Sequence, residues 1–215
     1  TWIDEDRPET ETIFDFYDDE VRWIDGLRSF VHIPQSGPDA GELVLIDTAS
    51  TSTRLITNDG SAKSFPYGYI HPATGKLEVL ALVNGDTGIG IWEDAGDEDL
   101  FRKVTSWSLP DQNGRTIGSP EPFVVGREVW ISFVVRDGPA GGPAEVWLAR
   151  TDGSHAHRCD DGETRLARSD PETLVSSRGV SVYYNVIEPT GYRLFRCVSG
   201  HAAMSDRLFH SNFEH

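Results

Sequence analysis

The sequence predicts an all-β protein, a five-bladed β-propeller in which each blade is a four-stranded antiparallel sheet. Three observations predict this fold: a unit that recurs along the chain, a turn that recurs within the unit, and leftover strand-like segments at both ends. Recurrence of a four-stranded unit every 40 to 50 residues or so is typical of propellers, because each blade buries its faces against its neighbours. We expect residues 1–215 to form one such domain.

Each unit opens with a short polar or proline-containing turn and runs into an apolar stretch rich in β-branched and aromatic residues. The five openings lie at Glu20, Phe65, Glu121, Asp170 and His201. Their spacing brackets the roughly 40 to 50 residues of one four-stranded blade. Five units therefore fit the length of the chain.

A second landmark recurs inside four of the units, where an apolar strand runs into a tight turn. These turns lie at Asp47, Asp94, Asp152 and Ser199. Asp, Ser and Gly suit tight turns because short side chains bond the local backbone and Gly accepts a positive φ. Since the turn keeps the same phase in each unit, it indicates a structural repeat.

The two ends of the chain look like parts of one blade. The unit that starts at His201 is long enough for only one or two strands. At the other end, residues 11–17 have the β-branched and aromatic content of a strand. We therefore expect the N-terminal strand to complete the last blade, which would remove two open sheet edges.

The composition predicts an acidic domain that can bury a sizeable core. Hydrophobic residues make up 38% of the chain, and no apolar run approaches the ~18 residues that span a bilayer. Acidic residues outnumber basic ones by 35 to 19, for a formal net charge of −16. Because such a surface repels nucleic acid and anionic lipid, we expect neither as a partner and predict a small-molecule or glycan ligand instead. The compartment, cytoplasmic or secreted, stays open.

The two cysteines, Cys159 and Cys197, belong to different units. A disulfide requires Cα atoms within about 7 Å, and the sequence does not fix that distance. We therefore expect two buried free thiols, with a disulfide as the alternative.

The residue that opens each unit is expected to face the central channel, because the innermost strand of each blade lines it. Aligning the openings puts Glu20, Phe65, Glu121, Asp170 and His201 into one ring position. Carboxylates that share a partly desolvated pocket raise at least one carboxyl pKa, so an acid and a base can coexist at neutral pH. The alternative is structural, because acidic residues beside proline also open ordinary turns.

Two units resemble blades of the five-bladed arabinanase and xylosidase-like glycoside hydrolases. The resemblance is carried by residues 119–135 with 144–153 and by residues 169–175 with 180–184, which open with an acidic residue and a proline. The resemblance implies three carboxylates and often a His-bound divalent cation on the channel axis.

Carried over residue by residue, the resemblance implies a catalytic site made from the unit openings. Glu121 would match the general acid, Asp170 or Glu20 would supply the other carboxylates, and His201 would be the axial metal ligand.

A second resemblance covers residues 41–57 and the turn at 169–172, which look like repeats of TolB-type propellers. Those repeats often serve protein–protein contact, and some accompany lyases and peptidases. Two functions therefore stay open: a hydrolase or lyase that uses axial carboxylates, and a non-catalytic propeller that binds a glycan, small molecule or protein. The fold by itself does not decide between them.

Aromatic residues near the expected channel are candidate substrate-binding groups, because sugars dock their apolar faces on aromatic rings. Tyr67 and Tyr69 lie close to the channel-facing Phe65, so we predict that these three contact the substrate. The structural alternative is that aromatic side chains in strands fill the space between blades.

Overall fold

The computed structural model describes residues 2–3, 11–12, 20–24, 26–96, 100–108, 114–138, 142–160, 162, 166–188 and 191–198. These residues are all-β, as predicted, and form four antiparallel sheets of three or four strands and one two-stranded sheet. No helix among them is long and apolar enough to cross a membrane. The predicted opening at His201 and residues 13–17 of the predicted N-terminal strand lie outside the described residues.

The strands follow one another within each sheet in chain order. Sheet I contains β3 (Glu20–Trp23), β4 (Ser29–Ile33), β5 (Val44–Asp47) and β6 (Thr53–Leu55). Sheet II contains β7 (Ser64–Ile70), β8 (Leu77–Val83), β9 (Gly88–Glu93) and β10 (Arg102–Ser108). Sheet III contains β11 (Arg115–Val125), β12 (Glu128–Asp137), β13 (Ala144–Arg150) and β14 (His157–Arg158). Sheet IV contains β15 (Ala167–Ser176), β16 (Gly179–Glu188) and β17 (Gly191–Val198), and the two-stranded sheet pairs β1 (Trp2–Ile3) with β2 (Glu11–Thr12).

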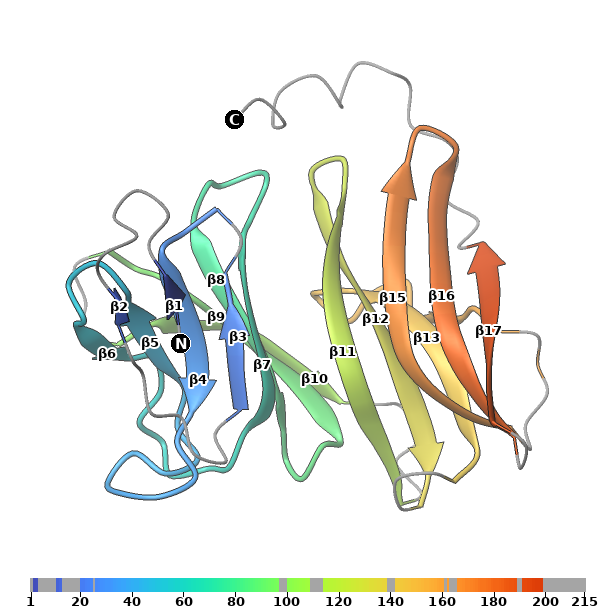
Figure 1. The fold of residues 1–215 in the computed structure, drawn as a ribbon, viewed down its shortest axis with the longest axis horizontal. Helices are drawn as coiled ribbons and strands as arrows, with labels where there is room; N and C mark the ends of the chain where they lie inside the picture. The colour runs from blue at the N-terminus through green and yellow to red at the C-terminus, as the bar shows by residue number, and fades with distance from the viewer. Residues whose placement is uncertain are drawn as a thin grey trace.

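The four larger sheets stand side by side in chain order, like successive blades (Figure 1). The first strand of each sheet lies against the first strand of the next, so β3 contacts β7, β7 contacts β11 and β11 contacts β15. Each of the first four predicted openings falls in one of these first strands. The predicted turns at Asp47, Asp94 and Asp152 fall at the end of the third strand of their sheets. Each of the first four predicted units therefore coincides with one sheet.

Apolar layers fill the space between neighbouring sheets. Along β8, Val79 and Ala81 pack in the layer between sheets I and II, whereas Leu80 and Leu82 pack in the layer between sheets II and III. Successive strand residues point to opposite faces, so a strand with a sheet on each side is buried on both faces and mostly apolar. All seven residues of β8 are accordingly buried.

The first strands of sheets II, III and IV each contain a β-bulge that includes a proline. The strand register shifts between Ser64 and Tyr67, between Gly118 and Glu121, and between Ser169 and Glu172. In each bulge the residue that precedes proline has a positive φ; these residues are Phe65 at 50°, Ser119 at 46° and Asp170 at 49°. Proline suits the unpaired position because it has no N–H to donate. Left-handed backbone is strained for residues other than glycine, and such strain clusters at functional sites.

The bulges correct the alignment expected from the sequence. The residues that directly precede the three prolines are Phe65, Ser119 and Asp170. The residues that directly follow them are Tyr67, Glu121 and Glu172. Glu121 therefore lies two residues further along its strand than the positions of Phe65 and Asp170. The sequence alignment was wrong here because it matched acidic residues instead of the bulges.

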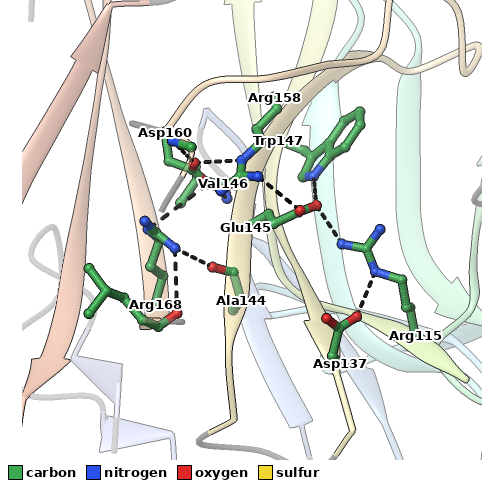
Figure 2. Close-up of polar contacts among 11 residues, drawn as sticks. Arg115, Asp137, Ala144, Glu145, Val146, Trp147, Arg158, Asp160 and Arg168 are labelled. Carbon is green, nitrogen blue, oxygen red and sulfur yellow. Dashed lines mark hydrogen bonds and ion pairs between the residues drawn. The ribbon is translucent and has the colours of Figure 1, made fainter. Parts of the chain in front are cut away.

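A polar network stabilises the outer part of sheet III, and Glu145 of β13 is one of its centres (Figure 2). Its carboxylate accepts hydrogen bonds from Trp147 Nε1 at 2.8 Å and from Arg158 Nη1 at 3.0 Å. It also pairs with Arg115 of β11. These cations hold the pKa of Glu145 below its usual range, although burial alone would raise it.

A second centre of the same network joins sheet III to sheet IV. The side chain of Asp160 is buried and accepts hydrogen bonds from Arg158 Nε and from the backbone N–H of Val146, each at 2.6 Å. Arg168, at the start of sheet IV, is fully buried and donates to the carbonyl of Ala144 at 2.6 Å. Charges buried this way need partners, so the network fixes how the two sheets dock (Figure 2).

A disulfide links the same two sheets and overturns the expectation of free thiols. Cys159, which directly follows β14, is bonded to Cys197 of β17, with a Cα–Cα distance of 5.8 Å. Both cysteines pack against the apolar layer between sheets III and IV. The expectation was wrong because the sequence does not fix the distance between the two cysteines, which the packing of sheet IV against sheet III brings within bonding range.

Candidate functional site

Polar side chains gather where the first strands of the four sheets run next to one another. The carboxylates, the cation and the phenol found there are Glu20 and Arg22 on β3, Tyr67 on β7, Glu121 on β11, and Asp170 and Glu172 on β15. Because the first strands of successive sheets are in contact, residues more than a hundred positions apart influence one site.

Glu121 is the half-buried carboxyl group of this site. Tyr67 Oη donates a hydrogen bond to Glu121 Oε1 at 2.6 Å. Burial raises the pKa of Glu121, and the carboxylates of Glu172 and Asp170 add to the rise, while the bond from Tyr67 opposes it. A carboxyl group with a raised pKa keeps its proton closer to neutral pH and is suited to proton donation.

Tyr67 lies between Glu121 and Arg22, a cation on the neighbouring strand β3. The Arg22 guanidinium carbon lies 5.3 Å from the centre of the Tyr67 ring. Burial raises the pKa of Tyr67 to about 12, with a further contribution from its bond to Glu121. Tyr67 is therefore a neutral phenol at physiological pH and can donate its hydrogen bond to Glu121.

Glu20 and Asp170 lie in different surroundings from Glu121. Glu20 Oε2 accepts a hydrogen bond from the backbone N–H of Phe65, so this carboxylate ties β3 to the bulge of β7. Asp170 is exposed, and Ser119 Oγ donates to its Oδ1 at 3.4 Å. Of the two, Asp170 is the more accessible to a ligand or to water.

A pocket of about 470 Å³ opens between β7 and β11, with Trp23 of β3 in its wall. Glu121 and Tyr67 both line it. The hydrogen-bonded pair therefore faces a space that can admit a small molecule, which is the arrangement expected of a binding site.

The predicted aromatic residues separate into one site residue and two core residues. Tyr67 lines the pocket and contacts Glu121. Tyr69 also lines it, but its ring is buried in the layer between sheets II and III and its hydroxyl donates to Glu78 Oε2 at 2.7 Å. Phe65 packs against the same layer and is not among the residues that line the pocket.

The predicted metal ligand, His201, lies outside the described residues, so its role stays a prediction. Within the ranges that the structure describes, no group of three or more His, Cys, Asp or Glu side chains could hold a metal ion.

Sequence reasoning missed Glu172 and Arg22. Glu172 directly follows the proline of its bulge, as Tyr67 and Glu121 follow theirs, so aligning Pro66, Pro120 and Pro171 would have found it. Arg22 carries no comparable signal, because only the packing of β3 against β7 brings it over Tyr67.

The sequence of this chain matches no family model and no curated protein. Solved structures that it resembles include arabinanase-type and galactanase-type enzymes. The endo-arabinase from Bacteroides thetaiotaomicron VPI-5482 has 12% identity and a TM-score of 0.48 over 90% of this chain and 77% of that one. The exo-beta-1,3-galactanase from Phanerochaete chrysosporium, solved with beta-1,3-galactotriose, has 11% identity and a TM-score of 0.49 over 83% of this chain and 45% of that one.

The similarity extends to enzymes of other activities. A puromycin hydrolase has 15% identity and a TM-score of 0.48 over 81% of this chain, which spans only 31% of that one. Similarities of this strength do not determine the activity of this chain.

Proposed function

We propose that the protein is a carbohydrate-active propeller, a glycoside hydrolase or lyase, with Glu121 as its general acid. The observation that supports this most is the half-buried Glu121 carboxyl in the wall of a pocket, with Asp170 and Glu172 near enough to raise its pKa. Cleavage of a glycosidic bond needs one protonated and one ionised carboxyl group on opposite sides of the bond. A site whose carboxyl groups differ in burial can supply both.

In this reaction the Glu121 carboxyl would donate its proton to the glycosidic oxygen as the bond to the anomeric carbon breaks. An ionised carboxylate would activate the incoming water or stabilise the positive charge on the sugar. Asp170 is the preferred second group because it is exposed, whereas Glu20 is bonded to the backbone of Phe65. Tyr67 would hold the Glu121 carboxyl in place, leaving Oε2 available to the substrate.

A panel of chromogenic glycosides combined with a glycan array tests this proposal directly. Turnover of any glycoside that is lost in Glu121→Gln supports the hydrolase or lyase. Binding on the array without turnover would instead favour the alternative, a non-catalytic propeller that binds a glycan. A chain that neither cleaves nor binds any carbohydrate would refute both carbohydrate functions and leave a small-molecule or protein ligand.

Replacement of Tyr67 by phenylalanine is expected to move the pH profile to higher pH. The hydrogen bond from Tyr67 lowers the pKa of Glu121, so its loss should let that pKa rise further. A general acid works in its protonated form, and activity falls as the pH rises through its pKa. The basic limb of the kcat/KM profile should therefore shift upward.

The matched control for this experiment is Tyr69→Phe, which removes the same hydroxyl from the same strand but breaks a bond to Glu78. Its pH profile should keep the basic limb of the unmodified protein. A limb that stayed in place or moved to lower pH in Tyr67→Phe would contradict the assigned contact.

We infer in addition that the sheets belong to a ring of five blades, with the N-terminal strands completing the last one. An equal interval supports this: β1 ends at Ile3 and β3 begins at Glu20, just as β5 ends at Asp47 and β7 begins at Ser64. By this interval β1 and β2 take the places of the third and fourth strands of a blade. Their antiparallel pairing with each other fits that role.

Deletion of residues 1–18 is expected to destabilise the whole domain, because it removes the outer strands of a blade and opens a sheet edge. At about 2–4 °C per kcal/mol for a domain of this size, we expect the melting temperature to fall by at least 5 °C or so. Differential scanning calorimetry of the full and shortened chains measures this. Equal melting temperatures would rule out the closure.

A further inference from the structure

Three exposed apolar side chains surround the pocket that holds Glu121. Trp23 is 41% exposed, Ile70 is 37% exposed and Val124 is 39% exposed, and all three line the pocket. We call them the apolar rim. Each comes from the first strand of a different sheet and lies three residues after Glu20, Tyr67 or Glu121, respectively.

The rim and the polar site divide the pocket into two chemically different parts. Glu121 and Tyr67 supply the hydrogen-bonding groups, whereas the rim offers only apolar surface apart from the indole N–H of Trp23. Exposed apolar side chains that gather at one pocket mark a place where an apolar group binds. The aliphatic side chains of Ile70 and Val124 offer no hydrogen-bond partner to the hydroxyl groups of a sugar, whereas an aromatic ring would bury apolar surface against them.

The charges of the site restrict that group further. Glu121 lines the pocket, and the carboxylates of Glu172 and Asp170 lie near enough to act on it electrostatically. Arg22 is the cation that the described residues place among them. An apolar group that also carried a carboxylate would be repelled, so the group is neutral or cationic.

We propose that the apolar rim binds a neutral aromatic aglycone, with the glycosidic oxygen placed at the Glu121 carboxyl. The assignment of the aglycone rests on the proposed function, and the aromatic binding site itself rests on the rim. In the cleavage step the bond between the anomeric carbon and the glycosidic oxygen breaks, and its electron pair stays on oxygen. That oxygen takes the proton of Glu121, and an aryl alcohol leaves. Water adds to the anomeric carbon, and its proton goes to the second carboxylate, so the step needs no other reactant.

The test uses 2-naphthol, a neutral aryl alcohol without a glycosidic bond, so binding is measured independently of turnover. Isothermal titration calorimetry compares the unmodified chain with Ile70→Thr/Val124→Thr, which keeps β-branched residues in both strands. We expect 2-naphthol to bind about tenfold more weakly to the double variant, because a polar hydroxyl replaces an apolar group at two contacts. 2-Naphthoate, the carboxylate analogue, should bind the unmodified chain more weakly than 2-naphthol.

Leu174→Thr is the control, because Leu174 is an exposed apolar residue of sheet IV that is not among the residues lining the pocket. Its affinity for 2-naphthol should equal that of the unmodified chain. Equal affinities in the double variant, or no binding to the unmodified chain, would overturn the proposal. If 2-naphthol binds through the rim but no aryl glycoside is cleaved, the aromatic site stands and the hydrolase proposal is refuted.

Discussion

Replacement of Glu121 by glutamine is expected to lower kcat on a cleaved glycoside by about 10²- to 10⁴-fold without unfolding the protein. Glutamine has the shape of glutamate, and its amide oxygen can still accept the hydrogen bond from Tyr67. It cannot donate a proton to a leaving oxygen as an acid. Because Asp170 and Glu172 disfavour a charge at this position, a neutral side chain should leave the melting temperature unchanged or slightly raised.

The leaving group provides a sharper version of this experiment. A 2,4-dinitrophenyl glycoside departs without protonation, so Glu121→Gln should lose much less activity on it than on a methyl glycoside. Glu128→Gln is the control, since Glu128 lies on β12 and pairs with Arg150 at 3.4 Å, away from the pocket lining. Full turnover of a methyl glycoside by Glu121→Gln would show that another group is the acid.

Removal of the disulfide is expected to produce the largest loss of stability. A chain with both Cys159→Ala and Cys197→Ala should lose about 2–5 kcal/mol of unfolding free energy, because the bond restricts an unfolded chain over a separation of 38 residues. At about 2–4 °C per kcal/mol, the melting temperature should fall by roughly 4–20 °C. Thermal unfolding followed by circular dichroism measures the change.

Reduction of the unmodified chain gives an independent control. The chain contains two cysteines, so dithiothreitol acts on this bond alone and should lower the melting temperature by a similar amount. The double variant itself should not respond to the reductant. If neither reduction nor substitution changed the melting temperature, the buried polar network would suffice to hold sheets III and IV together.

The sequence by itself determined the all-β class, the first strands of four sheets and the turns that end three of the third strands. These follow from local physics: a strand buried on both faces is mostly apolar, as β8 is, and tight turns need short polar residues such as Asp47 and Asp152. The sequence also placed Glu20, Glu121 and Asp170 on first strands, because every unit begins with one.

Only the tertiary structure decided which of these residues meet. Tyr67, Glu121 and Glu172 each directly follow a β-bulge, and the extra residue of a bulge changes which face the side chains beyond it occupy without any change in composition. The pairing of Cys159 with Cys197 depends on the docking of two sheets, which is fixed by contacts between residues distant in sequence. Local patterns specify strands and turns, whereas the register and docking of sheets follow from how all the strands pack together.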